Sequence, residues 1–117
     1  MDMVADFLRD HHNYILKSID ELTHNRLLSR NVTIINKLGI HARPAAMIAK
    51  IAQKAEKAVW ISSEYDRADA SSVIDILSIC GRKGSAILLE IETENDMNVL
   101  ESIVQLIKKG FGEDIDD

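Results

Sequence analysis

One short segment of the chain places a nucleophilic side chain, a fixed cation and a helix-starting pattern side by side. Residues 39–46 read Gly-Ile-His-Ala-Arg-Pro-Ala-Ala. Pro44 suits the first turn of a helix, where the amide N–H groups have no intrahelical partners, so we expect a helix to begin directly after His41. The N–H groups of Ala42 and Arg43 and the guanidinium of Arg43 would then surround the imidazole with anion-binding groups.

The imidazole of His41 is suited to phosphoryl transfer. A neutral imidazole is a nucleophile and a good leaving group, and an unperturbed ring titrates near cellular pH. The helix N-terminus and Arg43 both disfavour the charged ring, so we expect His41 to be largely neutral at pH 7. No second general acid or base and no metal-binding cluster accompanies it, so we expect no cofactor, no metal and no free-standing enzyme.

This segment and its flanks resemble the active-site signature of HPr, the histidine-containing phosphocarrier of the bacterial phosphoenolpyruvate:sugar phosphotransferase system. Residues 32–38 resemble the first strand of that family, and residues 70–77 resemble the region that holds its regulatory serine. In the family, enzyme I passes a phosphoryl group to Nδ1 of the histidine, and an EIIA-type domain removes it. The resemblance implies that His41 accepts the phosphoryl group, that Arg43 stabilises it, and that the partners supply the catalysis.

Ser72 has two interpretations. Residues 72–75 read Ser-Val-Ile-Asp, a capping-box pattern that predicts a helix beginning after the serine. The resemblance implies instead a regulatory phosphoserine, written by HPr kinase/phosphorylase, and a phosphate is tolerated at a helix N-terminus. The family's common lysine before this serine is Ser71 here, and Asp69 and Asp75 add negative charge. We therefore favour the helix cap.

The resemblance also implies a docking surface beside the histidine, apolar at its centre and basic at its rim. Asp75 places the opposite charge in that rim. Charge complementarity governs the choice of partner and the association rate, so we expect a less acidic enzyme I or a regulatory branch of the system. The residues expected on this surface are Ala46, Met47, Lys50, Val73, Ile74 and Leu77.

Composition limits the classes of partner. The chain has 117 residues, of which 46% are hydrophobic and 4% aromatic, which favours one domain with an aliphatic core. Its net charge of −5 gives no basic field for nucleic acid, and its apolar runs are too short for membrane insertion. The start of the chain lacks the basic region of a secretory signal. The single cysteine, Cys80, forms no internal disulfide, which fits the cytoplasm, and we expect it to be a small buried apolar residue.

Residues 1–30 are predicted to form one helix with an apolar stripe. Such a stripe must pack on the rest of its own chain, on the same helix of a second chain in a homodimer, or on an unrelated partner. Three polar residues interrupt the spacing of a coiled-coil seam. These are His11, His12 and Ser18, whereas the stripe comprises Val4, Phe7, Leu8, Ile15, Ile19 and Leu22. We expect His11, His12 and His24 to be solvated rather than metal ligands, because adjacent side chains diverge on a helix.

The remainder predicts an α+β fold with one sheet and helices packed on one face. The resemblance implies an HPr-like open-faced β-sandwich, with a four-stranded antiparallel sheet in the order β-α-β-β-α-β-α. The expected strands are 32–35, 58–63, 67–70 and 85–91, and the expected helices are 42–56, 72–79 and 96–109. The link at 64–67 lacks a glycine turn, so we expect a loose loop or Asp66 in the left-handed conformation. The domains would be a helical extension over 1–30, a phosphocarrier domain over 31–113 and an acidic tail over 114–117, frayed from Phe111 onward.

Two functions follow from these patterns. The first is a phosphocarrier in sugar uptake or in a regulatory phosphotransferase branch. The second is a regulatory HPr-like docking module that acts through protein–protein binding and its N-terminal helix. His41 and Arg43 favour the first, whereas the acidic residue in the docking rim and the extension give weight to the second.

Overall fold

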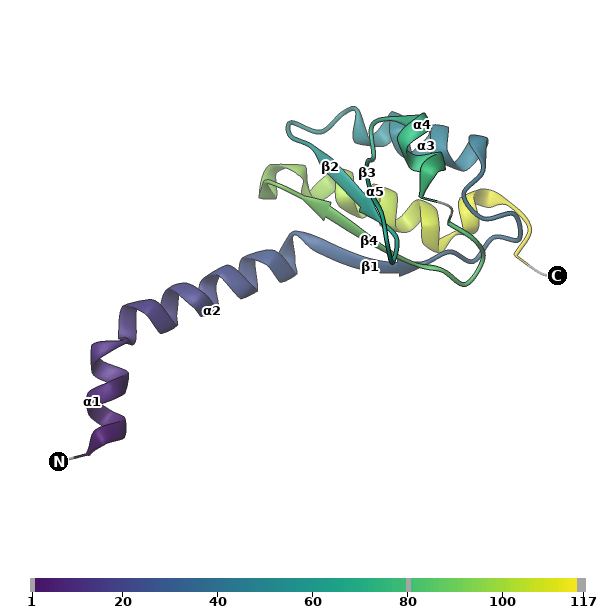
Figure 1. Cartoon of the computed structure of the whole chain (residues 1–117). Coiled ribbons are helices and arrows are strands. Elements are labelled where there is room, and N and C mark those ends of the chain that lie inside the picture. The colour runs from purple at the N-terminus through teal and green to yellow at the C-terminus, as the bar shows by residue number, and fades with distance from the viewer. Residues whose placement is uncertain (1, 80, 116–117) are drawn as a thin grey trace.

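Four strands form a single antiparallel sheet in the computed structural model. The structure describes residues 2–79 and 81–115, and for residues 23–27 it describes the backbone alone. The strands are β1 (Ser29–Thr33), β4 (Ala86–Ile91), β2 (Val59–Ser62) and β3 (Arg67–Asp69), in that spatial order. Three helices, α3 (Ala42–Ala52), α4 (Val73–Ser78) and α5 (Met97–Lys108), lie on one face of the sheet (Figure 1). The 3-10 turns η1 (Glu94–Asp96) and η2 (Gly110–Gly112) flank α5. The predicted α+β, HPr-like architecture is therefore confirmed.

The core lies between the sheet and the helices. Along β4, Ile87, Leu89 and Ile91 are buried and point to the helices, whereas Leu88 and Glu90 are half-buried on the open face. This alternation is the period of a strand with one covered face. Phe111 is the one aromatic side chain among the described residues that is buried in this aliphatic core.

The N-terminal extension is not the single helix over 1–30 that was predicted. It forms α1 (Met3–Asp10) and α2 (His12–Leu27), and β1 already begins at Ser29. His11 ends α1, because its backbone N–H and its Nδ1 lie 3.0 and 2.8 Å from the carbonyl oxygen of Phe7, and its ring stacks on that of Phe7. Leu28 is buried in the core, which draws the chain into the sheet two residues before the predicted domain boundary.

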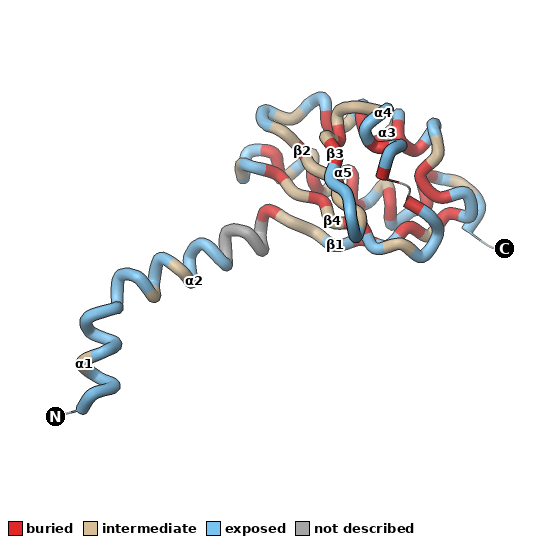
Figure 2. The backbone as a smooth tube through the Cα atoms, viewed as in Figure 1, coloured by how far each residue is buried: buried red, intermediate tan, exposed pale blue. Residues whose placement is uncertain are grey.

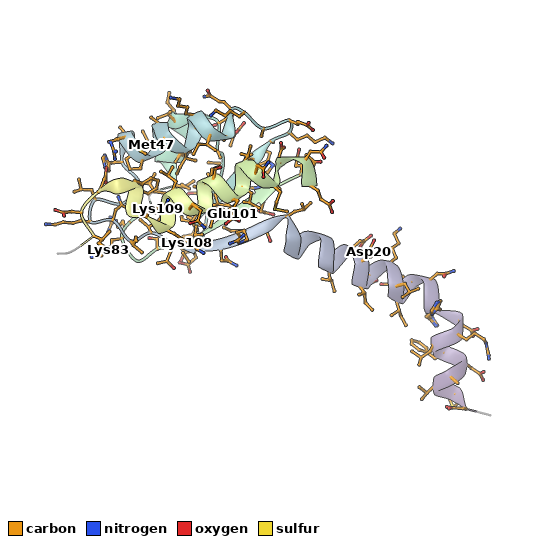
Figure 3. The ribbon with its side chains drawn as sticks, turned by 180° about the vertical axis from the view of Figure 1, so that it is seen from behind. Asp20, Met47, Lys83, Glu101, Lys108 and Lys109 are labelled. Atoms are coloured by element: carbon orange, nitrogen blue, oxygen red, sulfur yellow. The ribbon has the colours of Figure 1, made fainter. Side chains whose placement is uncertain are left out.

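Residues 2–27, which we call the arm, project away from the domain (Figure 1). Residues 2–22 of the arm are almost entirely exposed (Figure 2), and α1 has no buried residue. Seen from behind, the side chains along the arm, with Asp20 labelled, stand clear of the domain (Figure 3). Packing on its own domain, the first of the three expected arrangements, is therefore not realised.

Asp96 explains why α3 ends at Ala52 instead of reaching residue 56. The Asp96 carboxylate is buried and accepts the backbone N–H groups of Glu56 and Lys57 at 2.8 and 3.0 Å. These amides are thereby taken from the helix ladder. The side chain belongs to the start of α5, so the contact joins segments that are 40 residues apart.

The link between β2 and β3 is the loose loop that was one of the two expectations. The Ser63 N–H donates to the carbonyl of Asp66 at 2.8 Å, and Asp66 is not left-handed. Among the described residues other than glycine, only Phe111 has a positive φ, of 58°. The prediction of a frayed segment from Phe111 onward is wrong for residues 111–115, since the buried Phe111 ring anchors it.

Several expectations concern single residues or absences. His11 and His12 are exposed, whereas the side chain of His24 and all of Cys80 lie outside the described residues. Within the described ranges, no group of three or more His, Cys, Asp or Glu side chains is arranged to hold a metal ion. Over the same ranges, no helix has the length and apolarity needed to span a membrane.

Candidate functional site

His41 occupies the N-cap position of α3. Its backbone is extended, with φ −96° and ψ −170°, and its ring makes no capping hydrogen bond. The carbonyl of His41 accepts the N–H of Ala45 at 3.0 Å, which starts the helix, and Pro44 lies buried in the first turn. The ring is therefore presented at the helix N-terminus, where the N–H groups of Ala42 and Arg43 have no carbonyl partner within the helix.

The loop before His41 is held by contacts that require glycine. Gly39 has a φ of +66°, and a Cβ at this position would lie 2.3 Å from the carbonyl oxygen of Gly81. That same oxygen accepts the N–H of Ile40 at 2.7 Å. The buried Asn36 side chain donates to the carbonyl of Gly39 at 2.8 Å. The backbone entering His41 is thus fixed from two sides.

Glu113, a residue that the sequence analysis missed, contacts the edge of the His41 ring at Nε2. Its carboxylate oxygens lie 2.9 and 3.0 Å from Nε2 of His41. Nη1 of Arg43 donates to Oε2 of Glu113 at 2.8 Å, and Nδ2 of Asn36 donates to Oε1 at 3.0 Å. Arg43 thus binds a carboxylate beside His41, whereas the predicted binding of phosphate by the N–H groups of Ala42 and Arg43 stays a prediction.

The environment of Glu113 keeps this carboxylate ionised. Burial acts to raise its pKa, but hydrogen bonds from His41, Asn36 and Arg43 outweigh burial and hold the pKa of Glu113 below its ordinary value. The segment is anchored by Phe111, whose carbonyl accepts a hydrogen bond from Nη1 of Arg43 at 3.1 Å. A detectable signal was present in the sequence, since Gly110-Phe111-Gly112 sets a rare aromatic residue between two glycines.

The carboxylate of Glu113 is a neighbour of the His41 ring that the sequence analysis did not count, and the expectation of a neutral ring stays a prediction. The contact also has a direction, because it engages Nε2. No residue in the described parts of the chain bonds Nδ1, which leaves that nitrogen as the one available to an incoming group.

Ser72 is the N-cap of α4, as predicted. Its Oγ accepts the N–H of Asp75 at 3.3 Å. The neighbouring Ser71 takes no part in this cap, because both its N–H and its Oγ–H donate to Oδ1 of Asp69, at 2.9 and 2.7 Å. A regulatory phosphoserine at Ser72 stays a prediction.

The residues predicted for docking all lie on α3 and α4, two helices that contact each other beside the His41 loop. Ile74 is 80% exposed and is the most exposed apolar side chain of the set. Ala46, Lys50 and Leu77 are exposed, whereas Met47, labelled in Figure 3, and Val73 are half-buried. The structure thus brings these residues onto adjoining helices, and their docking role stays a prediction.

Comparisons with known proteins agree with this geometry. The family model described as the PTS HPr component phosphorylation site matches residues 28–109. Phosphocarrier protein HPr of Cupriavidus necator is 32% identical over 74% of this chain and 98% of its own length. Phosphocarrier protein NPr of Escherichia coli K12 is 34% identical over 74% of this chain and 98% of its own length.

Solved structures give the same result. The crystal structure of HPr-C-His from Thermoanaerobacter tengcongensis has a TM-score of 0.69 and 30% identity, covering 74% of this chain and 97% of that one. A crystal structure of an HPr dimer from the same organism has a TM-score of 0.58 and 32% identity, covering 70% and 94%. The matched region holds β1, the histidine at the N-cap of α3 and the arginine two residues later. The chain therefore belongs to the HPr family of phosphotransferase-system phosphocarriers.

Proposed function

We propose that this chain accepts a phosphoryl group on His41 from enzyme I, for which phosphoenolpyruvate is the original donor, and passes it to an EIIA-type acceptor. The observation that carries the proposal is an imidazole set inside an anion site. Arg43 and the His41 ring both bond the Glu113 carboxylate, and the first turn of α3 begins directly after the ring.

Glu113 contributes to the chemistry by selecting a ring nitrogen. A neutral imidazole whose Nε2–H donates to the carboxylate carries its lone pair on Nδ1. Nδ1 attacks the phosphorus, and the bond from phosphorus to the donor's nitrogen or oxygen breaks. The proton on Nε2 remains hydrogen-bonded to Glu113, so the positive charge that develops on the ring meets a fixed negative charge.

Arg43 would stabilise the transferred group. Its guanidinium is 55% exposed and hydrogen-bonded through Nη1 to Glu113 and Phe111, so the remaining N–H donors of its fork are available to phosphate oxygens. The N-terminus of α3 adds the favourable end of the helix dipole. The partners supply the catalysis, and the chain acts as a carrier in the cytoplasm rather than as an enzyme.

Intact-mass measurement tests the proposal. The wild-type chain is mixed with enzyme I, Mg²⁺ and phosphoenolpyruvate, and we expect an acid-labile gain of one phosphoryl group. His41→Ala should show no gain, whereas His12→Ala, which removes an exposed histidine on the arm, should behave like the wild type. No gain on the wild type, with enzyme I active on an ordinary HPr, would refute the proposal.

The branch of the system is a finer question. HPr and NPr relatives match this chain at similar identities, 32% and 34%, so identity does not decide between the two branches. We propose to identify the acceptor by measuring the rates of phosphoryl transfer from this chain to EIIA domains of the sugar type and of the nitrogen-regulatory type. HPr kinase/phosphorylase is a further proposed partner, acting at Ser72. The partner-docking surface on α3 and α4, with Ala46, Met47, Lys50, Val73, Ile74 and Leu77, would serve these encounters.

The second candidate is a docking module that acts through its arm. The specific observation in its favour is the exposure of the arm, which none of the phosphoryl chemistry uses. In cells, loss of function on His41→Ala supports the carrier. Loss of function on deletion of residues 1–30, with His41→Ala tolerated, supports the module.

A further inference from the structure

We propose that the arm pairs antiparallel with the arm of a second copy of this chain. The pairing is independent of phosphoryl transfer and gives a dimer held by α1 and α2. The seam would consist of the apolar stripe, defined as Val4, Phe7, Leu8, Ile15, Ile19 and Leu22.

The arm exposes apolar side chains far more densely than the domain does. Between residues 3 and 22, eight large apolar side chains are between 50% and 84% exposed, whereas the described part of the domain has five that are 38% exposed or more. Those of the arm are Met3, Val4, Phe7, Leu8, Tyr14, Leu16, Ile19 and Leu22. Exposed apolar surface gathered on one segment marks an interaction site.

The available area fits a dimer. A fully exposed side chain of this size offers roughly 60–120 Å² of apolar surface. Five side chains of the stripe are 50% to 70% exposed and Ile15 is half-buried, so the stripes of two arms together offer on the order of 400–800 Å². A standard specific interface buries about 1,600 Å² in total, of which a little over half is apolar. Two stripes therefore supply a large part of the apolar area that such an interface contains.

The spacing of the stripe favours an antiparallel arrangement. The pattern is symmetric about Asn13, so an antiparallel pair sets Val4 against Leu22 and Phe7 against Ile19. His11 and Ser18, the polar residues in the seam, then face Ile15 and Leu8 of the other chain. In a parallel pair each of these polar residues would face its own copy, and polar pairs in a seam reduce stability.

Charge argues against a membrane as the occupant. Asp2 caps α1, Asp6 and Asp10 lie within it, and its one cation, Arg9, is paired with Asp6. Helices that bind anionic lipid surfaces carry Lys and Arg on the polar face, which α1 lacks apart from Arg9.

The first experiment measures mass against concentration by light scattering or sedimentation, using the full-length chain. We expect a species of twice the 13.1 kDa chain mass. Phe7→Glu and Leu22→Glu should each weaken association at least tenfold. Leu16→Glu is the matched control, because Leu16 is 51% exposed but lies about 100° around the helix from Ile15, and it should change association less than twofold. Circular dichroism verifies that each variant keeps its helix content.

A wild-type chain that stays monomeric at several hundred micromolar would overturn the proposal and leave a different protein as the occupant of the stripe. Equal effects of Leu16→Glu and Phe7→Glu would also overturn it. Orientation is tested in a Cys80→Ser background by mixing Val4→Cys with Leu22→Cys. Antiparallel pairing predicts a mixed disulfide between the two variants, whereas a disulfide formed mainly between two Val4→Cys chains would overturn the antiparallel arrangement.

Discussion

Replacing Glu113 by glutamine should favour the phosphorylated form of the protein. Glu113 lies against Nε2 of His41 and binds Arg43 and Asn36. The substitution keeps the size of the side chain and one carbonyl oxygen but removes the negative charge. If His41 carries the phosphoryl group as proposed, the attraction between Glu113 and the transient ring charge ends when the Nε2 proton leaves to solvent. In the neutral product, wild-type Glu113 repels the phosphoryl group and competes with it for Arg43.

The magnitude follows from Coulomb's law. A dianionic phosphoryl group on Nδ1 would lie roughly 6 Å from the carboxylate, across the ring from the observed contact, and the repulsion is then about 1.4 kcal/mol at the dielectric constant of water. The side chain of Glu113 is only 17% exposed, so the value for water is the lower bound. An energy of about 1.4 kcal/mol corresponds to a tenfold change in an equilibrium constant.

The assay is the equilibrium with enzyme I at fixed ratios of phosphoenolpyruvate to pyruvate, with the phosphorylated fraction read by intact mass at alkaline pH. We expect Glu113→Gln to need about a tenfold lower ratio than the wild type for half phosphorylation. Asp114→Asn is the matched control, because it removes the same charge one residue further along, where only the backbone carbonyl of Asp114 bonds the described domain. A phosphorylated fraction in Glu113→Gln equal to or below that of the wild type would refute the reasoning.

The remaining predictions concern stability and are all measured by urea unfolding. Because the pKa of Glu113 is lowered from 4.5 in the folded state, the stability that it confers is complete above about pH 4.5 and is lost as the pH falls through the lowered value. The gap in unfolding free energy between wild type and Glu113→Gln should therefore close as the pH falls below 4.5, and a gap that widened on acidification would contradict this. Gly39→Ala should cost at least about 3 kcal/mol, because its Cβ meets the backbone of the Gly81 loop. Gly84→Ala, at a φ of +89° with open space around it, should cost only the strain of about 1–2 kcal/mol, and equal costs would show that the contact is unimportant. Ser72→Ala should lower the free energy of unfolding by about 1 kcal/mol and Ser72→Asp should hardly change it. An unchanged free energy of unfolding in Ser72→Ala would show that the cap does not stabilise the protein.

Features encoded by neighbouring residues were predictable from the sequence. The position of His41 at the start of α3 follows from a proline three residues later, and Ser72 follows from the acid at Asp75. The strand expected over 85–91 matches β4. Each of these patterns spans a few residues, and local geometry is enough to realise it.

Features that depend on distant contacts were missed. Glu113 reaches His41 across 72 residues, and only the anchoring of Phe111 in the core explains why it does so. The early end of α3 depends on the buried Asp96, which comes from a segment that no local pattern connects to it.

The break in the arm was missed for a different reason. His11 carries no signal of the kind that Gly or Pro gives, and it ends α1 through a ring hydrogen bond and a ring stack on Phe7. Such side-chain competition for a carbonyl is well known for Ser, Thr, Asn and Asp. In a histidine it is harder to anticipate from a sequence.

The contact between His41 and Glu113 also sets an order of events during synthesis. The ribosome makes the nucleophile 72 residues before the anion that contacts it, and β4 and α5 are completed in between. Domains generally fold as units as the chain emerges, so a nascent chain displays the imidazole without this contact until the segment around Glu113 has emerged. For the same reason, a purification tag fused close behind Glu113 would sit beside the reactive ring, and one placed ahead of the arm would not.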